Sequence, residues 1–357
     1  MRSVRVEPDG AGWRLAGPAT TGFEVVNDYL GYLLDRRYSD RTVRAYAFDL
    51  LHFVRWLVGG EVGLAEVTTD VLLQYLADCR QAVVAGQHGG NVVLIRTGRS
   101  SGYASATVNR RLAATSGLFG FRAMRDPSLP NPMPRGPARR PGTRERTGEL
   151  AHLTRAKPRS RLRVRQPRRL PRGLDTEETR TLLASFRSDR DRAIAGLMLL
   201  SGLRSAEVLG LRVRDVDIGR RWVQVVGKGD KERRVPLDPE VAGLIQTYLL
   251  VERPETDTTV LFVVGKGPHR GRPLTPAGLR TVFRYHRARA GVPTGNPHAL
   301  RHTFGTALAE AGVDLAVIKT LMGHDHVDST AAYIHLAPAH VRAAYDAARS
   351  RQRAAGR

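Results

Sequence analysis

One tyrosine and three histidines lie within the thirteen residues GHDHVDSTAAYIH (323–335). Tyr333 follows His324 by nine residues and precedes His335 by two. A tyrosine hydroxyl can attack a phosphodiester and form a covalent intermediate when a neighbouring group accepts its proton. A single tyrosine in a short helix-like segment is more often a half-buried core residue. Whether Tyr333 does chemistry therefore depends on what else the chain offers.

Two segments in the middle of the chain carry cationic side chains that suit a phosphate. In SGLRSAEVLGL (201–211), Arg204 lies at a predicted junction between helices, and Glu207, three residues later, can hold its guanidinium. In GKGDKERRVPL (227–237), Lys228 lies in a turn between two predicted strands. An arginine and a lysine of this kind can bind and protonate the oxygens of a phosphodiester.

A third segment, PHALRHTFGT (297–306), places His298 and Arg301 on one face of a predicted helix. Two arginines can clamp the non-bridging oxygens of a phosphodiester and stabilise the charge of the transition state, as Mg²⁺ does elsewhere. A lysine or histidine must protonate the leaving ribose oxygen. The sequence offers no obvious carboxylate pair for a metal, so these residues together predict metal-free phosphoryl transfer.

These motifs, in this order, resemble those of the tyrosine recombinase (phage integrase) family. The family pattern is T/S-G-L-R-x-x-E, a lysine in a G-K-G turn, H-x-x-R, and then G-H with a tyrosine nine residues after the histidine. H-x-x-R alone is uninformative, but the ordered set is highly specific. The resemblance covers about residues 174–345, with Ser201 at a position where threonine is commoner. The helical module at 23–125 resembles the family's SAM-like core-binding domain.

The resemblance implies how a phosphate would be held. Arg204 and Arg301 would bind the scissile phosphate, with Glu207 in support. His324 would donate a hydrogen bond to the same phosphate.

The resemblance also implies the path of the protons. His298 would act as the general base toward Tyr333, the nucleophile, and Lys228 as the general acid toward the 5′-hydroxyl. A 3′-phosphotyrosyl link would conserve the bond energy, so neither a metal nor a cofactor is expected.

Other residues compete for some of these roles. Lys231 shares the turn of Lys228, and Lys266 lies in a second GKG (265–267). The pair of histidines in HDH (324–326) lacks a third ligand at a plausible spacing, so a metal site is not favoured. His302, His326 and His335 are expected to be structural or exposed. Four cationic residues are expected to contact DNA outside the catalytic set: Arg110, Arg111, Lys231 and Arg233.

Composition supports a nucleic-acid partner. The chain has 57 Lys and Arg against 34 Asp and Glu, a formal net charge of +23. A field of this strength concentrates polyanions. No apolar run approaches the length of a membrane span, the N-terminus lacks the apolar core of a signal peptide, and Cys79 is the single cysteine. We therefore expect a cytoplasmic, nucleoid-associated protein with no membrane partner.

The periodicity of apolar residues predicts a mainly α chain. Helical patterns fill both halves, and RWVQVVGKGDKERRVPL (221–237) predicts a small antiparallel sheet in the second. Taken with the family resemblance, the expected fold is a helical SAM-like core-binding domain followed by a mixed α+β catalytic domain. The expected parts are an N-terminal arm or hairpin (1–22), the core-binding domain (23–126), a basic Pro/Arg-rich linker (127–172), the catalytic domain (173–345) and a basic tail (346–357).

The linker and a Gly-rich insertion at 85–103 are unusual for the family. Between residues 135 and 172 the chain has 13 Arg and 1 Lys against two Glu, a net charge of +12. A block of like charge with many prolines predicts an extended segment that orders against phosphates.

The first functional hypothesis is a site-specific recombinase acting on double-stranded DNA within a homo-tetramer, with a monomer or dimer off DNA. Integration or excision of a mobile element is the preferred role, and a Xer-type dimer resolvase is the alternative. A type IB topoisomerase would share the chemistry but act as a monomer. A non-catalytic DNA-binding relic is the third class, which the intact motif set disfavours.

Overall fold

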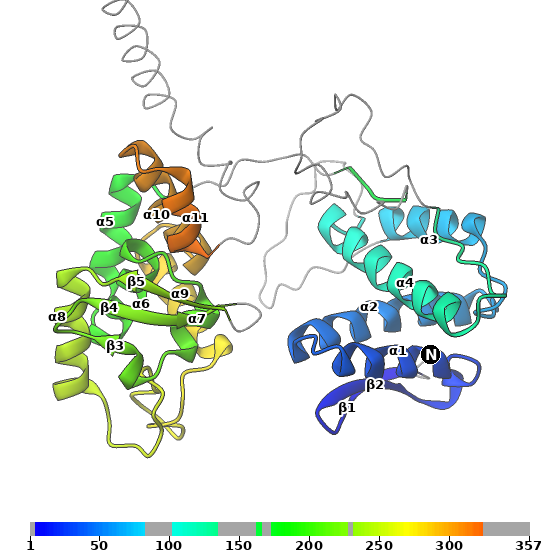
Figure 1. Ribbon diagram of the computed structural model, residues 1–357, viewed down its shortest axis with the longest axis horizontal. Coiled ribbons are helices and arrows are strands. Elements are labelled where there is room, and N and C mark those ends of the chain that lie inside the picture. Colours follow the sequence, from blue (N-terminus) through cyan, green and yellow to red (C-terminus); the bar gives the residue numbers. More distant parts are fainter. Residues whose placement is uncertain (1–3, 83–101, 135–161, 166–172, 228–230, 324–357) are drawn as a thin grey trace, which may run out of the picture. The chain divides into compact units, whose positions relative to one another are not determined.

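The computed structural model of the chain describes residues 4–82, 102–134, 162–165, 173–227 and 231–323. The chain divides into two compact units, residues 1–167 and 168–357, each with its own core (Figure 1). The prediction of a mainly helical chain with small antiparallel sheets is confirmed. Among the described residues, no helix combines the length and the apolar character that crossing a bilayer requires.

The N-terminal unit is a set of helices with a hairpin packed against it. Strands β1 (Arg5–Asp9) and β2 (Gly12–Ala16) pair antiparallel, and β2 lies against the first two helices. The hairpin therefore belongs to this unit, because Val4 and Leu15 are buried in its core. The helices are α1 (Glu24–Asp35), α2 (Asp40–Gly59), α3 (Thr69–Gln81) and α4 (Ser105–Arg125).

A short piece of the basic segment predicted as a linker is fastened to α4. The amide of Asn109 donates to the carbonyl oxygen of Val164 (3.0 Å), and the backbone N–H of Val164 donates back to the Asn109 Oδ1 (2.9 Å). Leu162 is buried in the N-terminal core. Residues 162–165 thus pack as part of the N-terminal unit, which ends at residue 167.

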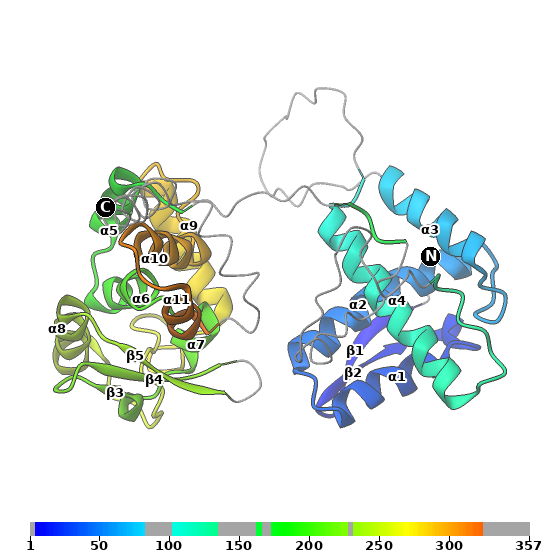
Figure 2. The same cartoon turned by 45° about the horizontal axis from the view of Figure 1, so that its top comes forward.

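The C-terminal unit surrounds one helix that is buried on all sides. Every residue from Ala193 to Leu199 in α6 (Asp189–Leu200) is buried, as expected for a helix without a polar face. It packs against α8 (Pro239–Thr247) and α10 (Pro297–Glu310) (Figure 2). The remaining helices are α5 (Thr176–Ser185), α7 (Ser205–Gly210), α9 (Pro276–Arg289) and α11 (Leu315–Met322), with a π-helical turn at Tyr248–Glu252.

The three-stranded sheet of this unit has the order β3 (Val216–Asp217), β4 (Trp222–Val226), β5 (Glu232–Pro236) and is antiparallel throughout. Val223 and Val225 of β4 are buried and pair with Val235 and Arg233 of β5. Because side chains alternate along a strand, Arg233 shares the inner face with Val235. An arginine thus points inward from the sheet toward α7 and α11.

Candidate active site

The turn between α6 and α7 places Arg204. Ser201 donates from its hydroxyl to the carbonyl oxygen of Pro236 (2.9 Å), which ties the end of α6 to β5. Gly202 follows with a φ of +65°, and a β-carbon there would lie 2.4 Å from the ring of Phe304. Only glycine combines this backbone conformation with such a close approach. Arg204 then forms the N-cap of α7.

Glu207 binds both the backbone and the side chain of Arg204. Its carboxylate accepts from the backbone N–H of Arg204 (2.7 Å) and from its Nη1 (2.8 Å). Glu207 is 7% exposed. Burial raises the pKa of its carboxyl, but hydrogen bonds from Arg233 and Arg204 outweigh that effect, so the net pKa lies below its ordinary value. Glu207 is therefore a charged carboxylate that fixes the guanidinium beside it, as predicted.

Arg233 completes the coordination of that carboxylate. Its Nη1 and Nη2 donate to the two oxygens of Glu207, each at 2.9 Å, and its side chain is 11% exposed. The expectation of a DNA contact at Arg233 does not fit this burial. The alternation of Arg233 with Val235 was the sequence signal for an inward side chain.

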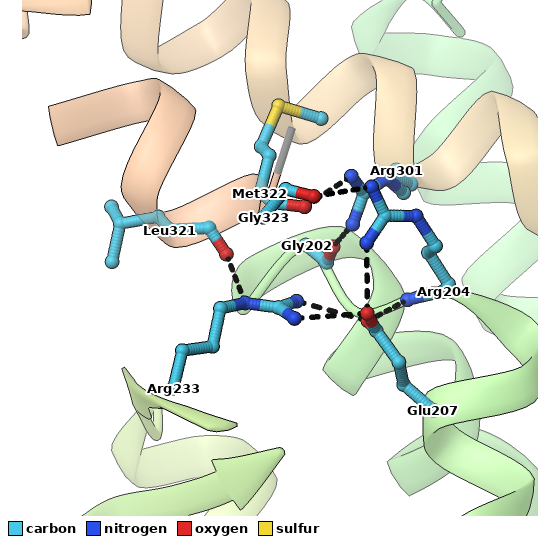
Figure 3. A network of polar contacts seen from close by, with 8 residues as sticks. All are labelled: Gly202, Arg204, Glu207, Arg233, Arg301, Leu321, Met322 and Gly323. Carbon is cyan, nitrogen blue, oxygen red and sulfur yellow. Dashed lines mark hydrogen bonds and ion pairs between the residues drawn. The ribbon is translucent and has the colours of Figure 1, made fainter. Parts of the chain in front are cut away.

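Arg301 lies on α10, which begins at Pro297 with Asn296 as its N-cap. Arg301 is 4% exposed and donates to the carbonyl oxygens of Gly202 and Met322. Both arginines expected to hold a phosphate therefore lie in one cluster (Figure 3).

The C-terminal end of α11 is where the arginines converge. Three successive carbonyl oxygens accept from three arginines on three different elements: Leu321 from Arg233, Met322 from Arg301 and Gly323 from Arg204 (Figure 3). The end of a helix carries partial negative charge on its unpaired carbonyl groups, so cations gather there. Gly323 ends the helix with a φ of +59°. In the sequence, Gly323 directly precedes His324 and lies ten residues before Tyr333.

Two histidines of α10 are in direct contact. The Nε2 atoms of His298 and His302 lie 2.8 Å apart. Partial desolvation and the charges of Arg301 and Arg204 lower the pKa of His298. Burial, His298 and Arg301 lower the pKa of His302 to about 4. Both imidazoles are therefore neutral near pH 7, the form in which a histidine can accept a proton. Apart from the spacing of four residues between the two histidines, no sequence feature predicts this contact of His302.

Three of the six predicted catalytic residues lie outside the described residues: Lys228, His324 and Tyr333. Their chain neighbours, however, touch the cluster. A β-carbon on Gly227 would lie 3.5 Å from Arg233 Nη1 and 3.8 Å from Glu207 Oε1. Gly323, which precedes His324, accepts from Arg204 (2.7 Å). Lys231 is exposed, and its carbonyl oxygen accepts from the N–H of Gly227 (2.8 Å), which closes the hairpin turn.

The two arginines of α4 expected to contact DNA differ from each other. Arg110 forms an ion pair with the buried Asp49 (2.6 Å) while its side chain stays 52% exposed. Arg111 is instead 8% exposed, with Nη1 3.0 Å from His52 Nε2 and its guanidinium carbon 3.8 Å from the ring centroid of Tyr103. Arg111 is thus an internal residue, which does not fit the expectation of a DNA contact.

No group of three or more His, Cys, Asp or Glu side chains that could hold a metal ion occurs among the described residues. Separately, the guanidinium groups of the cluster described above are hydrogen-bond donors that suit an anion. Arginine forks and neutral imidazoles suit a phosphate group that is attacked and released.

Comparison with known proteins places the two units in known families. The description "Phage integrase family" matches residues 172–340, and "Phage integrase, N-terminal SAM-like domain" matches residues 26–87. Tyrosine recombinase XerC of Mycobacterium leprae (strain TN) is 30% identical over 329 residues, which cover 88% of this chain and 94% of that protein. Tyrosine recombinase XerC of Roseiflexus castenholzii is 29% identical over 328 residues, covering 88% and 89%.

Solved structures share the fold. The XerH site-specific recombinase bound to palindromic difH substrate, a post-cleavage complex, superposes with a TM-score of 0.62 at 20% identity, covering 92% of this chain and 84% of that one. The Tn1549 transposon integrase in complex with a circular intermediate DNA gives a TM-score of 0.61 at 17% identity, covering 89% and 98%. At these identities the likeness shows the fold alone.

Proposed function

Because the chain belongs to the phage integrase family of tyrosine recombinases, enzymes that cleave and rejoin DNA strands, we propose that it recombines double-stranded DNA at a specific site through a 3′-phosphotyrosyl intermediate on Tyr333. The observation that carries this proposal is the convergence of Arg204 and Arg301 at the C-terminal end of α11. Two fixed guanidinium groups at the start of the segment that bears the tyrosine are what a metal-free attack on a phosphodiester requires.

In the proposed site, Arg204 binds the scissile phosphate directly. Two of its five side-chain N–H donors serve Glu207 and Gly323, and its side chain is 37% exposed. A phosphate oxygen is a stronger acceptor than a backbone carbonyl, so a phosphate can replace the carbonyl of Gly323 as its partner. The buried Arg301 supplies further positive charge to the site, and its hydrogen bond to the carbonyl oxygen of Gly202 holds it in place. His324, next in the chain after Gly323, adds a further donor in this proposal.

The proposed cleavage step moves two protons. The Tyr333 hydroxyl attacks the phosphorus as its proton passes to the neutral imidazole of His298. The bond between phosphorus and the 5′-oxygen breaks, and Lys228 protonates that oxygen. Rejoining is the reverse of these events with a new 5′-hydroxyl, so the bond energy is conserved in the phosphotyrosyl ester.

The charge of the chain supports DNA as the partner. The net charge is +23, and α9 contains no acidic residue while exposing Arg280, Arg284 and Arg289. Such surfaces bind the phosphate backbone, and the affinity falls steeply with salt. We also propose a homo-tetramer on synapsed DNA, since two duplexes need four active sites, and a monomer or dimer away from DNA.

The preferred biological role is integration or excision of a mobile element. The second candidate, a Xer-type resolvase, is favoured by the names of the two relatives described above, which are both tyrosine recombinase XerC. The roles differ in the position of the target site: an attachment site beside the gene for a mobile element, and a chromosomal site elsewhere for a resolvase.

The test is to trap the covalent complex on nicked duplexes, in which the released strand is lost and rejoining is blocked. Duplexes tiled from the DNA that flanks the gene and from the rest of the chromosome identify the site. We expect a covalent adduct with the natural chain, none with Tyr333→Phe, and an unchanged amount with Tyr285→Phe, an exposed tyrosine of α9. An adduct formed by Tyr333→Phe refutes the assignment. Relaxation of arbitrary plasmid by the monomer would support the topoisomerase reading instead.

A further inference from the structure

Arg233 uses three nitrogen atoms for three acceptors. Nη1 and Nη2 donate to the two carboxylate oxygens of Glu207, and Nε donates to the carbonyl oxygen of Leu321, all at 2.9 Å (Figure 3). We propose that Arg233 is a positioning residue for strand cleavage: it holds Glu207 in place for Arg204 and fixes the end of α11 that leads to Tyr333. The inference rests on the proposed function, in which Arg204 binds the scissile phosphate.

The carboxylate of Glu207 is saturated with hydrogen bonds. Each oxygen of Glu207 accepts two hydrogen bonds, one from Arg204 and one from Arg233. The two arginines therefore bind opposite sides of one fixed acceptor. Without Arg233 the carboxylate loses half of its donors and is free to rotate toward Arg204, which moves the guanidinium expected to meet the phosphate.

Arg233 also binds the end of α11, through the carbonyl oxygen of Leu321. Leu321 lies two residues before Gly323, whose carbonyl oxygen accepts from Arg204. A β-carbon on Gly323 would lie 2.8 Å from Arg233 Nη1, so the guanidinium packs directly against this backbone. Arg233 thus sets the distance between β5 and the last turn of α11.

The side chain of Arg233 is largely buried. With a side chain that is 11% exposed and all three nitrogens engaged, Arg233 offers little surface to a DNA backbone. Arg234, the next residue of β5, is exposed on the other face of the strand. A role in positioning therefore predicts a loss of cleavage rate without a comparable loss of DNA affinity, and it distinguishes Arg233 from its neighbour of equal charge.

Lysine cannot replace this side chain. Its ammonium is a single point donor, whereas the guanidinium fork meets both carboxylate oxygens at once and still reaches Leu321. Arg233→Lys keeps the charge and most of the length, so it separates the geometry of the fork from the electrostatic potential of the site.

The experiment uses the full chain and the nicked duplex mapped with the natural protein. For Arg233→Met, Arg233→Lys and Arg234→Met we measure the single-turnover rate of covalent complex formation, the Kd for the duplex and the thermal unfolding temperature. A displacement of catalytic groups by about 1 Å costs about 100-fold in rate. We expect that loss in both Arg233 variants, a Kd within about threefold of the natural value, and a natural rate for Arg234→Met.

Three outcomes would overturn the inference: a rate close to the natural one in a folded Arg233 variant, an equal loss in Arg234→Met, or a loss confined to Kd. If Arg233→Met does not fold, Arg233→Lys carries the test, because it retains the ion pair. Tyr333→Phe and Arg204→Ala are measured in parallel. Cleavage by either would refute the proposed function itself, whatever Arg233 does.

A duplex with a methylphosphonate at the mapped scissile position separates positioning from general stability. This group lacks one charged oxygen, so the reaction depends less on the charge that Arg204 supplies. We expect the rate ratio between the natural chain and Arg233→Met to shrink by about tenfold on this substrate. An unchanged ratio would show that Arg233 does not act through Arg204.

Discussion

Arg301 donates a hydrogen bond to the carbonyl oxygen of Gly202, which lies 99 residues earlier in the chain. Gly202 is also two residues before Arg204, so one backbone turn joins both arginines of the proposed phosphate site. The turn is possible because Gly202 adopts a φ of +65° against the ring of Phe304. The positive φ and the close contact with Phe304 therefore explain why the S-G-L-R motif has a glycine at this position.

Gly202→Ala is expected to lower the free energy of unfolding of the C-terminal unit by about 2–4 kcal/mol, from backbone strain and a clash with Phe304. Urea unfolding measures this change. The matched control is Gly210→Ala at the end of α7, where a β-carbon meets nothing within 4 Å. Equal stability of the two variants would contradict the role of Gly202.

The pH dependence of cleavage is expected to follow His298. Its pKa lies below the ordinary value of 6.5, so the imidazole is a neutral base at pH 7. The single-turnover rate should hold as pH falls from 7 and decline only below about 6.5, when the imidazole becomes protonated. Single-turnover rates measured from pH 5 to 8 check this, and NMR titration of the histidines assigns the observed pKa to a residue. An acid limb centred above pH 6.5 would contradict it.

The same histidines link pH to stability. The pKa of His302 falls from 6.5 unfolded to about 4 folded. A lowered folded pKa means that the unfolded chain binds the proton more readily. The stability contribution is therefore complete above about pH 6.5 and is lost progressively as pH falls toward 4. In His302→Phe we expect a weaker decline of the unfolding free energy between these values, and an unchanged slope would count against the shift.

Glu207→Gln is expected to cost about 3–5 kcal/mol of unfolding free energy, because the buried Arg233 and the partly exposed Arg204 lose the buried negative charge that they share. The lowered pKa of Glu207 also makes the unfolding free energy depend on pH. The stabilising contribution of the Glu207 carboxylate is present above about pH 4.5 and is lost as pH falls through the lower pKa of the folded state. Thermal and urea unfolding of the variant from pH 3 to 7 measure both. The exposed Glu232→Gln is the control, with an expected change within about 0.5 kcal/mol.

Asn109→Ala is expected to release residues 162–165 from α4 at a cost of about 1–3 kcal/mol, since both hydrogen bonds to Val164 are lost. Asn109→Asp keeps the acceptor and loses the donor, so we expect its stability to lie between that of the natural chain and that of Asn109→Ala. In limited trypsin digestion, the release of residues 162–165 is measured as faster cleavage at Arg163 and Arg165. Equal cleavage in all three proteins would show that this anchor does not hold the segment.

Periodicity was enough to predict most of the helices and the antiparallel sheet. Each of these elements depends on local propensity and on an apolar face, as in the alternating Val223 and Val225 of β4. Periodicity was not enough to predict which arginines are exposed and which are buried. Arg110 and Arg111 are adjacent on one helix, and a rotation of one residue places the first at the surface and the second in the core.

The sequence by itself determined which residue types this chain brings to a phosphodiester and the order in which they occur. That order, from Arg204 to Tyr333, was sufficient to predict the family that the comparisons show. Only the tertiary structure decided what each guanidinium touches. Arg233 meets Glu207, Arg301 meets Gly202, and all three arginines meet the last turn of α11. These partners are separated by 21 to 119 residues. Burial and helix packing bring them together, and residue spacing alone does not encode such contacts.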